Sequence, residues 1–395
     1  MNYFTSNAPK LGRTLVWTTS RSLRVFKNQL PKRFFSSNAN SKKPGKAMLK
    51  LGLAGVTVGA LVGTGYSIHQ KNNPKDHLIN EEAFIEQVNE IPEIKPSKKV
   101  RYSGDNSNLQ LTLFQYQTCP FCCKVRAFLD YYGISYDVVE VDPVLRQSIK
   151  WSEYKKVPIL VARTQDGYQP LNDSTMIISA LMSYLKDSSD KSLPEIVKCF
   201  PFITFFDETG TKKKDIMNKY FLMLTAEQYQ NEDEQSLAEE RQWRKWTDNV
   251  LVHTLSPNVY RTREEAFQAF NWFSDVGQWE INFPSWERNL IIYVGASAMY
   301  LVGKRLKKRH NLKEDVRESL YDECSKWMKE IKAKGTTFHG GIKPNLADLA
   351  VYGVLNSIEG CLAFQDLLNR TSIGKWYFPM KEAIAGHQGA QVIQT

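Results

Sequence analysis

A C-x-x-C motif, Cys119 to Cys122, stands between an apolar-alternating stretch and a stretch of helical periodicity. Residues 109–113 have Leu at every second position, which predicts a strand with one buried face. Pro120 suits the first turn of a helix, and Gly133 is expected to end that helix. A thiol at a helix N-terminus faces unpaired N–H groups and the positive end of the helix dipole, which stabilise its thiolate. The sequence therefore predicts an activated thiol at Cys119.

The other two cysteines of this segment receive different expectations. Cys122 lies about one helical turn after Cys119 and is a candidate resolving thiol for a disulfide. Cys123 is rotated by roughly 100° from Cys122 and is expected to pack in the core. A metal clamp would need further ligands, but the chain has no second C-x-x-C and its six histidines lack zinc-binding spacing. We therefore expect no metal.

The stretches downstream are expected to alternate between helices and strands. Together with the first strand and helix they give the order βαβαββα, which is thioredoxin-like. If the peptide bond before Pro158 is cis, the backbone there would lie beside the thiol and accept an extended peptide such as glutathione. The predicted elements are a strand at 136–141, a helical stretch from Pro143 through Trp151, a strand at 156–162, a turn at Asp166–Gly167, a short strand to Leu171 and a helix from Ser174.

The basic charge of the chain is confined to its N-terminus. Of the 52 Lys and Arg residues, thirteen lie in residues 1–75, which contain no Asp or Glu, so the other 320 residues carry 39 bases against 42 acids. Nucleic acid is therefore not expected as a partner of the folded part. The leader, residues 1–46, has a basic amphipathic run and places Arg33 three positions before Ser36, which is typical of mitochondrial targeting.

An uncharged apolar run follows the leader at residues 51–68. At 1.5 Å per residue, this run just reaches across a hydrocarbon core of roughly 30 Å. We expect residues 47–70 to form a single-pass membrane anchor. Residence in the Golgi or endoplasmic reticulum membrane, and a soluble form produced by processing, stay open beside the mitochondrial expectation. Residues 71–107 are polar and are expected to form a linker with at most one short helix, near residues 81–89.

The rest of the chain is long enough for two domains. Asn345 and Asp348 have capping-box spacing before an apolar-periodic helix in the C-terminal part. The apolar run from Leu290 to Val302 is too short to span a membrane and is expected to be a buried helix. The predicted domains are a thioredoxin-like (glutaredoxin-like) α/β domain at residues 108–188, a connecting segment at residues 189–214 and an all-α domain at residues 215–395.

Three stretches, "LTLFQYQTCPFCCKVRAFLDYYGISYDVVEVDP", "YKKVPILVA" and "LNDSTMIISAL", resemble the glutaredoxin-like domain of the membrane-associated prostaglandin E synthase 2 family. The apolar anchor before them and the helical region after them fit the same family, so the resemblance covers residues 47–385. The helical region also resembles the C-terminal domain of glutathione transferases. In that domain the Asp of the capping motif is structural, and the same role is expected of Asp348.

The resemblance implies roles for individual residues. Tyr116 and Cys119 match the catalytic pair, and Phe121 matches an aromatic residue at the substrate pocket. Glutathione is the implied cofactor. Asp173 would also be a natural N-cap, and capping and ligand binding are compatible because a helix N-terminus holds a carboxylate well. The positions that match the glutathione site are Val157, Asp173 and Ser174.

These expectations lead to one preferred function and two alternatives. The preferred function is glutathione-dependent isomerisation of prostaglandin H2 to prostaglandin E2 by an activated thiol. The first alternative is a glutaredoxin-type thiol–disulfide oxidoreductase, which the thiol site fits equally well. The second is a membrane-tethered module that binds glutathione together with haem and cleaves the endoperoxide as a lyase. The group that takes the ring-carbon proton stays open, as does a homodimeric assembly.

Overall fold

The computed structural model describes residues 83–186, 191–206, 212–230 and 232–393, which all belong to one compact unit, Leu78–Thr395. The expected leader, residues 1–46, and the expected anchor, residues 47–70, lie outside the described residues. Within the described ranges, no helix combines the length and the apolar character needed to cross a bilayer.

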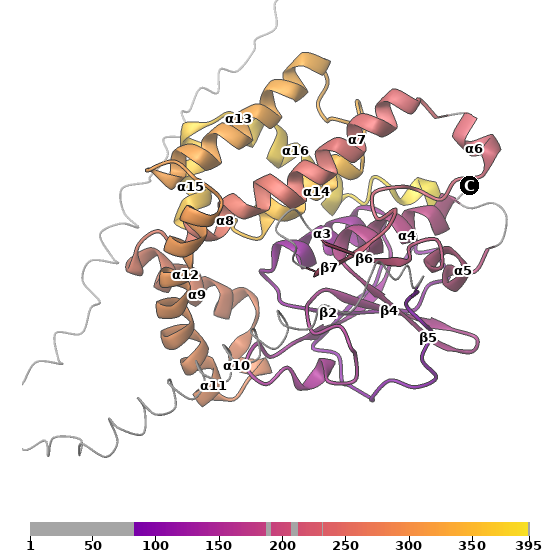
Figure 1. Ribbon diagram of the computed structural model, residues 1–395, viewed down its shortest axis with the longest axis horizontal. Coiled ribbons are helices and arrows are strands. Elements are labelled where there is room, and N and C mark those ends of the chain that lie inside the picture. Colours follow the sequence, from indigo (N-terminus) through magenta and orange to yellow (C-terminus); the bar gives the residue numbers. More distant parts are fainter. Residues whose placement is uncertain (1–82, 187–190, 207–211, 231, 394–395) are drawn as a thin grey trace, which may run out of the picture. The chain divides into compact units, whose positions relative to one another are not determined.

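A five-stranded sheet forms the centre of the α/β domain (Figure 1). Its order is β1-β3-β2-β4-β5, with β2 and β3 parallel and the other neighbours antiparallel. Helices α3 (Pro120–Tyr131) and α4 (Ser174–Lys186) pack against each other and share one apolar core with the sheet. This is the predicted thioredoxin-like arrangement. The strands are β1 (Lys98–Val100), β2 (Leu111–Gln115), β3 (Tyr136–Glu140), β4 (Ile159–Thr164) and β5 (Gly167–Asn172).

A smaller apolar cluster covers the opposite face of the sheet. Because side chains alternate along a strand, Leu113 packs in the helix-side core while Phe114 packs in this second cluster. Ile91 and Ile94 also pack there. The segment expected to be a linker therefore belongs in part to the domain: it supplies β1, and Val88 forms a bridge with Tyr168 of β5. No helix forms in residues 83–89.

The helical stretch expected from Pro143 through Trp151 is wrong. Only a single 3₁₀ turn, η1 (Gln147–Ile149), is present there. The cause is Asp142, whose carboxylate accepts hydrogen bonds from the backbone N–H groups of residues 145, 146 and 147. Arg146 is in the left-handed region with φ 50°, which an α-helix does not allow. The side chain of Asp142 thus replaces the helical hydrogen bonds with a turn.

The segment that connects the two domains contains its own structure. Helix α5 (Leu193–Val197) is followed by strands β6 (Phe202–Phe206) and β7 (Lys212–Ile216), which pair antiparallel. Nζ of Lys214 lies 4.1 Å from the centroid of the Phe202 ring, a cation–π contact across the hairpin.

The C-terminal domain is helical throughout, as predicted (Figure 1). Its longer helices surround a core that includes the buried Trp327 and Trp376. The elements are α6 (Ala226–Gln230), α7 (Glu234–Trp246), the π-helical turn η2 (Thr247–Leu251), α8 (Val252–Val259), α9 (Arg263–Val276), α10 (Trp279–Asn282), α11 (Ser285–Leu290), the π-helical turn η3 (Ile291–Gly295), α12 (Ala296–Arg309), α13 (Val316–Lys334), α14 (Leu346–Asn356), α15 (Leu362–Arg370), α16 (Gly374–Ala385) and the 3₁₀ turn η4 (Ala390–Ile393).

Helix α14 packs directly on α3, the helix that follows the thiol motif. A Cβ at Gly353 of α14 would lie 2.5 Å from the Cα of Lys124, so only glycine allows this close approach. The predicted capping box begins α14: the Asn345 side chain accepts from the backbone N–H of Asp348, and the Asp348 carboxylate accepts from that of Asn345. Asp348 also accepts from Trp376 Nε1 at 2.9 Å, which confirms its structural role.

The apolar run from Leu290 to Val302 is only half buried, so its expected burial is wrong for one face. Ile291, Ile292 and Ala296 are buried in the core. Tyr293 and Leu301 are 63% and 64% exposed. Both faces of this helical run are apolar, but the other described residues pack against only one face.

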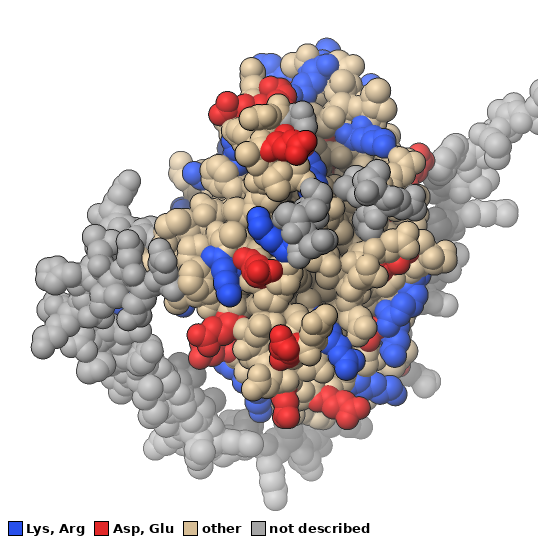
Figure 2. All heavy atoms as spheres, turned by 90° about the vertical axis from the view of Figure 1, so that its right-hand side faces the viewer, with Lys and Arg blue, Asp and Glu red and all other residues tan. Residues whose placement is uncertain are grey.

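The face shown in Figure 2 carries charges of both signs. Over the described residues visible on that face, Lys and Arg side chains are interspersed with Asp and Glu side chains. A mixed surface of this kind differs from the basic stripe that nucleic-acid-binding domains present.

Candidate active site

Cys119 occupies the N-cap position of α3. The Cys122 thiol contributes most to lowering the pKa of Cys119 below its ordinary value, and it outweighs the opposite effect of burial. The nearby backbone N–H groups of Cys122 and Phe121 lower this pKa further. The side chain of Cys119 is partly exposed, whereas Cys122 and Cys123 are buried. Cys119 is therefore the thiol of this motif that is both activated and accessible.

The other two thiols of the motif stay protonated. Burial, together with its bond to the Cys119 sulfur, raises the pKa of Cys122 well above the ordinary range. Burial also raises the pKa of Cys123 to about 11. Cys123 Sγ lies 3.1 Å from Nη2 of Arg126. Because Cys123 is buried in the core, its expected packing role is confirmed.

Tyr116 and Val157 both pack against the smaller apolar cluster of the sheet. The carbonyl oxygen of Tyr116 accepts a hydrogen bond from the backbone N–H of Cys119 at 3.1 Å. Burial raises the pKa of Tyr116, so its phenol is protonated at neutral pH and can donate a hydrogen bond. The Val157–Pro158 peptide bond is cis.

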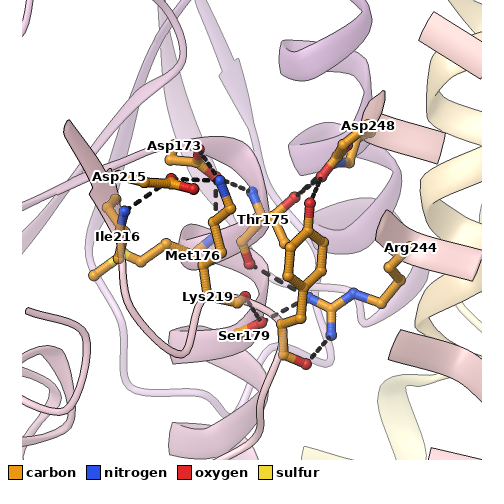
Figure 3. Close-up of polar contacts among 11 residues, drawn as sticks. Asp173, Thr175, Met176, Ser179, Asp215, Ile216, Lys219, Arg244 and Asp248 are labelled. Carbon is orange, nitrogen blue, oxygen red and sulfur yellow. Dashed lines mark hydrogen bonds and ion pairs between the residues drawn. The ribbon is translucent and has the colours of Figure 1, made fainter. Parts of the chain in front are cut away.

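Asp173 caps helix α4 (Figure 3). Its Oδ1 accepts from the backbone N–H groups of Thr175 and Met176 at 2.9 and 3.3 Å, so the expected capping role is confirmed. Its φ is 68°, a left-handed conformation that Asp tolerates better than most residues. Ser174, the first residue of α4, is buried. The second carboxylate oxygen of Asp173 is free of these capping bonds and faces a cation.

That cation is Lys219, which sequence analysis did not single out. Its Nζ lies 3.8 Å from Oδ2 of Asp173 and 2.6 Å from Oδ1 of Asp215 (Figure 3). Although burial opposes it, the two carboxylates raise the pKa of Lys219. The Asp173 carboxylate and the Lys219 ammonium therefore lie close to each other at the N-terminus of α4.

A buried ion pair links the α/β domain to the helical domain. Nζ of Lys124, on α3, lies 2.5 Å from Oδ1 of Asp248 on η2. Thr175 Oγ1 donates to Asp248 Oδ2 at 2.6 Å (Figure 3). The same hydroxyl accepts from Lys124 at 2.8 Å, and the Tyr220 hydroxyl also donates to Asp248. Although burial would raise it, the Lys124 ammonium and these two hydroxyl donors hold the pKa of Asp248 below its ordinary range. The network sets the position of the helical domain relative to α3 and α4.

A cavity of about 290 Å³ opens beside Cys119, between the two domains. This volume is at the lower end of small-molecule pockets, which range over roughly 300–1,000 Å³. Cys119 and Phe121 belong to its α/β wall. The apolar side chains of its helical wall are Val252, Leu255, Val259, Phe273 and Ile358.

The predicted site residues thus form three groups rather than a single cluster. Cys119 and Phe121 line the cavity, Tyr116 and Val157 lie on the sheet side, and Asp173 and Ser174 begin α4. Two residues near the thiol were missed. Tyr154 has a pKa raised by burial and by the charges of Asp173, Cys122 and Cys119, and His253 lines the cavity. No local motif marks either residue, since tertiary packing alone brings them to the site.

His339 belongs to a small group of possible metal ligands, but its ring is engaged with other side chains. Ligand atoms of Glu239, Glu330 and His339 lie within 4.8 Å of one another. However, Nδ1 of His339 accepts from the side-chain amide of Asn345, so that Nε2 carries the proton and has no lone pair for a metal. Glu239 is already paired with Lys334 at 2.6 Å. The His339 ring stacks on Trp327 and has a packing role.

The fold and the site define a thiol-dependent enzyme of glutaredoxin type in which a second, helical domain covers the thiol. Comparison with known sequences agrees: the Glutaredoxin family model matches residues 111–165. The chain is 48% identical to prostaglandin E synthase 2 from Mus musculus over 281 residues, 71% of each chain. It is 43% identical to prostaglandin E synthase 2 from Danio rerio over 329 residues, 82% of this chain and 80% of that relative. The protein belongs to the prostaglandin E synthase 2 family.

Among solved structures, glutathione transferase F7 from Populus trichocarpa is similar over 72% of this chain and 99% of its own, with 14% identity and a TM-score of 0.39.

Proposed function

We propose that this protein isomerises prostaglandin H2 to prostaglandin E2 with an activated thiol. Membership of the prostaglandin E synthase 2 family supports this substrate and this product. The observation that carries the mechanism is that Cys119, whose pKa is lowered, opens onto an apolar cavity with its far wall in the helical domain. A lipid suits such a wall, whereas a folded protein disulfide has little access to a thiol covered in this way.

The reaction needs a nucleophile that is released unchanged. The Cys119 thiolate attacks one oxygen of the endoperoxide; an S–O bond forms, the weak O–O bond breaks, and the other oxygen takes a proton to become a hydroxyl. Removal of the hydrogen from the carbon that bears the sulfur-linked oxygen then forms the ketone and breaks the S–O bond, which returns the thiolate. Tyr116, protonated at neutral pH, is the proposed hydrogen-bond donor to the thiolate or to the departing oxygen. No net oxidation or reduction occurs.

Glutathione is the proposed cofactor, and the charges at the start of α4 fit it. Oδ2 of Asp173, which makes no capping bond, can accept from the ammonium group of the tripeptide, while Ser174, the helix N-terminus and Lys219 can hold its carboxylate. Val157 offers backbone groups to the middle of the peptide. Bound there, glutathione would supply a second thiol beside Cys119.

The small size of this cavity gives no support for haem, and we derive no step from it. The volume of about 290 Å³ is at the lower end for a small molecule, and a porphyrin is a larger plate than the bicyclic endoperoxide. The endoperoxide lyase alternative, which rested on haem, is therefore less favoured.

Thiol–disulfide exchange is the second candidate function. The observation in its favour is that Cys122 follows the N-cap Cys119 by three residues at the start of α3 and that each of the two thiols shifts the pKa of the other, since a resolving thiol must lie close to the nucleophile. A product assay separates the two functions. The protein is incubated with glutathione and either prostaglandin H2 or a small mixed disulfide, and the products are quantified by mass spectrometry. Isomerisation predicts prostaglandin E2 well above the uncatalysed yield; disulfide reduction without prostaglandin E2 would contradict the proposal.

The N-terminal expectations belong to the proposal as well. A membrane anchor at residues 51–68 would place the enzyme beside a substrate that partitions into the bilayer. The leader composition supports a mitochondrial membrane over the Golgi or endoplasmic reticulum. Imaging of a full-length fusion against organelle markers tests this, and a homodimer is tested by light scattering of the purified chain.

A further inference from the structure

The cavity beside Cys119 has three ionisable side chains among its described lining residues: Cys119, His253 and Tyr260. Cys119 is the nucleophile of the proposed reaction. Burial raises the pKa of Tyr260, so its phenol cannot act as a base near neutral pH. His253 is the remaining side chain of this wall that can accept a proton.

Helix α8 turns His253 toward the cavity. His253 and Ser256 are spaced at i and i+3, so they share one face of the helix. Both line the cavity, as does Tyr260, the residue at which the helix ends. The helix begins directly after the π-helical turn η2, which also holds Asp248 in the interdomain ion pair. The imidazole of His253 is thus presented from the helical domain to the space that the Cys119 thiol enters from the α/β domain.

The His253 ring is held in place by a second imidazole. It stacks on His310, the C-cap of α12, with ring centroids 4.1 Å apart and an interplanar angle of 11°. A stacked ring keeps a fixed orientation, which a proton acceptor for a carbon–hydrogen bond requires.

We infer that His253 is the base that removes the ring-carbon proton after the endoperoxide has been opened. The inference rests on the proposed isomerase function and deepens it. One imidazole nitrogen takes the proton from the carbon that bears the sulfur-linked oxygen. The electron pair of that C–H bond forms the carbonyl π bond, and the S–O bond pair leaves with sulfur as the thiolate. The protonated imidazole then loses its proton to water, so atoms and electrons balance without an added oxidant.

The charges around His253 suit this task. Burial, the neighbouring His310 and the Arg309 guanidinium lower the pKa of His253, and the more distant Asp248 carboxylate opposes them only in part. His253 is therefore largely neutral at pH 7, which is the form that accepts a proton.

Substitution of His253 tests the role directly. His253→Gln keeps a polar side chain of similar length but cannot accept a proton from carbon. We expect its kcat for prostaglandin E2 formation to fall by about 100-fold or more, in the range typical of a lost general base, with a much smaller change in KM. In His253→Ala, added imidazole should restore part of the rate. The matched control is His310→Gln, which removes the stacking ring but leaves the base, and it should lose no more than about tenfold.

A substrate deuterated at the reacting ring carbon gives a kinetic isotope effect, which would not change if His253 had only a structural role. The isotope effect on prostaglandin E2 formation should be larger in His253→Gln than in the parent, because proton removal becomes slower. The rate of Cys119 alkylation by iodoacetamide should stay unchanged. Two results would overturn the inference while leaving the isomerase function intact. The first is a kcat of His253→Gln within tenfold of the parent. The second is the absence of both effects: no imidazole rescue of His253→Ala and no larger isotope effect in His253→Gln. A parent protein that makes no prostaglandin E2 overturns both.

Discussion

Nζ of Lys124 lies 2.5 Å from Oδ1 of Asp248, and this ion pair joins the helix that carries the thiol motif to the helical domain that covers it. Lys124 is 1% exposed, so its ammonium has exchanged water almost entirely for Asp248 and the Thr175 hydroxyl. The same η2–α8 segment that supplies Asp248 also supplies His253 to the cavity. The pair therefore connects the position of the nucleophile to the position of the opposite cavity wall.

Removal of Asp248 should destabilise the protein strongly. Asp248→Ala leaves the Lys124 ammonium buried without a counter-charge, and we expect a loss of about 3–5 kcal/mol in the free energy of unfolding. Urea denaturation followed by tryptophan fluorescence measures this loss. The control is Asp322→Ala, which breaks an exposed pair with Lys313 and should cost less than about 1 kcal/mol. Equal losses in the two variants would contradict a dominant role for the buried pair.

The same pair predicts how stability depends on pH. The folded-state pKa of Asp248 lies below that of an unfolded Asp, about 3.9, so the folded state binds this proton more weakly. The contribution of Asp248 to stability is therefore complete only well above the unfolded pKa, from about pH 5 upward, and is lost as the pH falls from there through the folded-state pKa. Between pH 5 and pH 3 the free energy of unfolding of the parent should fall more steeply than that of Asp248→Asn. Parallel curves would show that another group causes the acid sensitivity.

Ser174→Ala separates ligand binding from helix capping. Asp173 already supplies the capping hydrogen bonds to Thr175 and Met176, so the loss of the Ser174 hydroxyl should change the melting temperature little. If that hydroxyl holds the glutathione carboxylate, affinity should fall by about 10- to 150-fold, corresponding to about 1.5–3 kcal/mol for one hydrogen bond to a charged group. Calorimetric titration with glutathione beside a thermal melt measures both quantities. An affinity within twofold of the parent would remove Ser174 from the proposed binding site.

Truncation should show where the folded unit begins. A chain that starts at Leu78 keeps the backbone bonds between Val88 and Tyr168 and the packing of Ile91 and Ile94, and it should be as stable and as active as a longer chain. A chain that starts at residue 98 loses both features. It also loses the backbone bond from Phe202 to Ala83 and the one from Ser97 to Val138. We expect it to be about 4–6 kcal/mol less stable, from four backbone hydrogen bonds at about 1 kcal/mol each and partial burial of two isoleucines. Equal unfolding midpoints for the two truncations would show that residues 83–97 act only as a tether.

The sequence was informative where structure depends on local pattern. The strand before Cys119, the helix that begins at Pro120 and the capping box at Asn345 each follow from neighbouring residues, and all three are present. The helix expected after Pro143 failed because the Asp142 side chain competes for the backbone N–H groups. His253 and Lys219 could not be found, since only the packing of α14 on α3 and the interdomain ion pair bring them near the thiol and the start of α4.

The most direct test of the account compares Cys119→Ser with Cys122→Ser in prostaglandin E2 formation from prostaglandin H2. Cys119 is the activated and accessible thiol, so Cys119→Ser should lose on the order of 1,000-fold or more in turnover. Cys122 only lowers the pKa of Cys119, and a serine hydroxyl can still donate a hydrogen bond to the thiolate, so Cys122→Ser should stay within about tenfold of the parent. This unequal result is what a single-thiol isomerase predicts. An equal collapse of prostaglandin E2 formation in both variants would contradict it and favour a dithiol cycle.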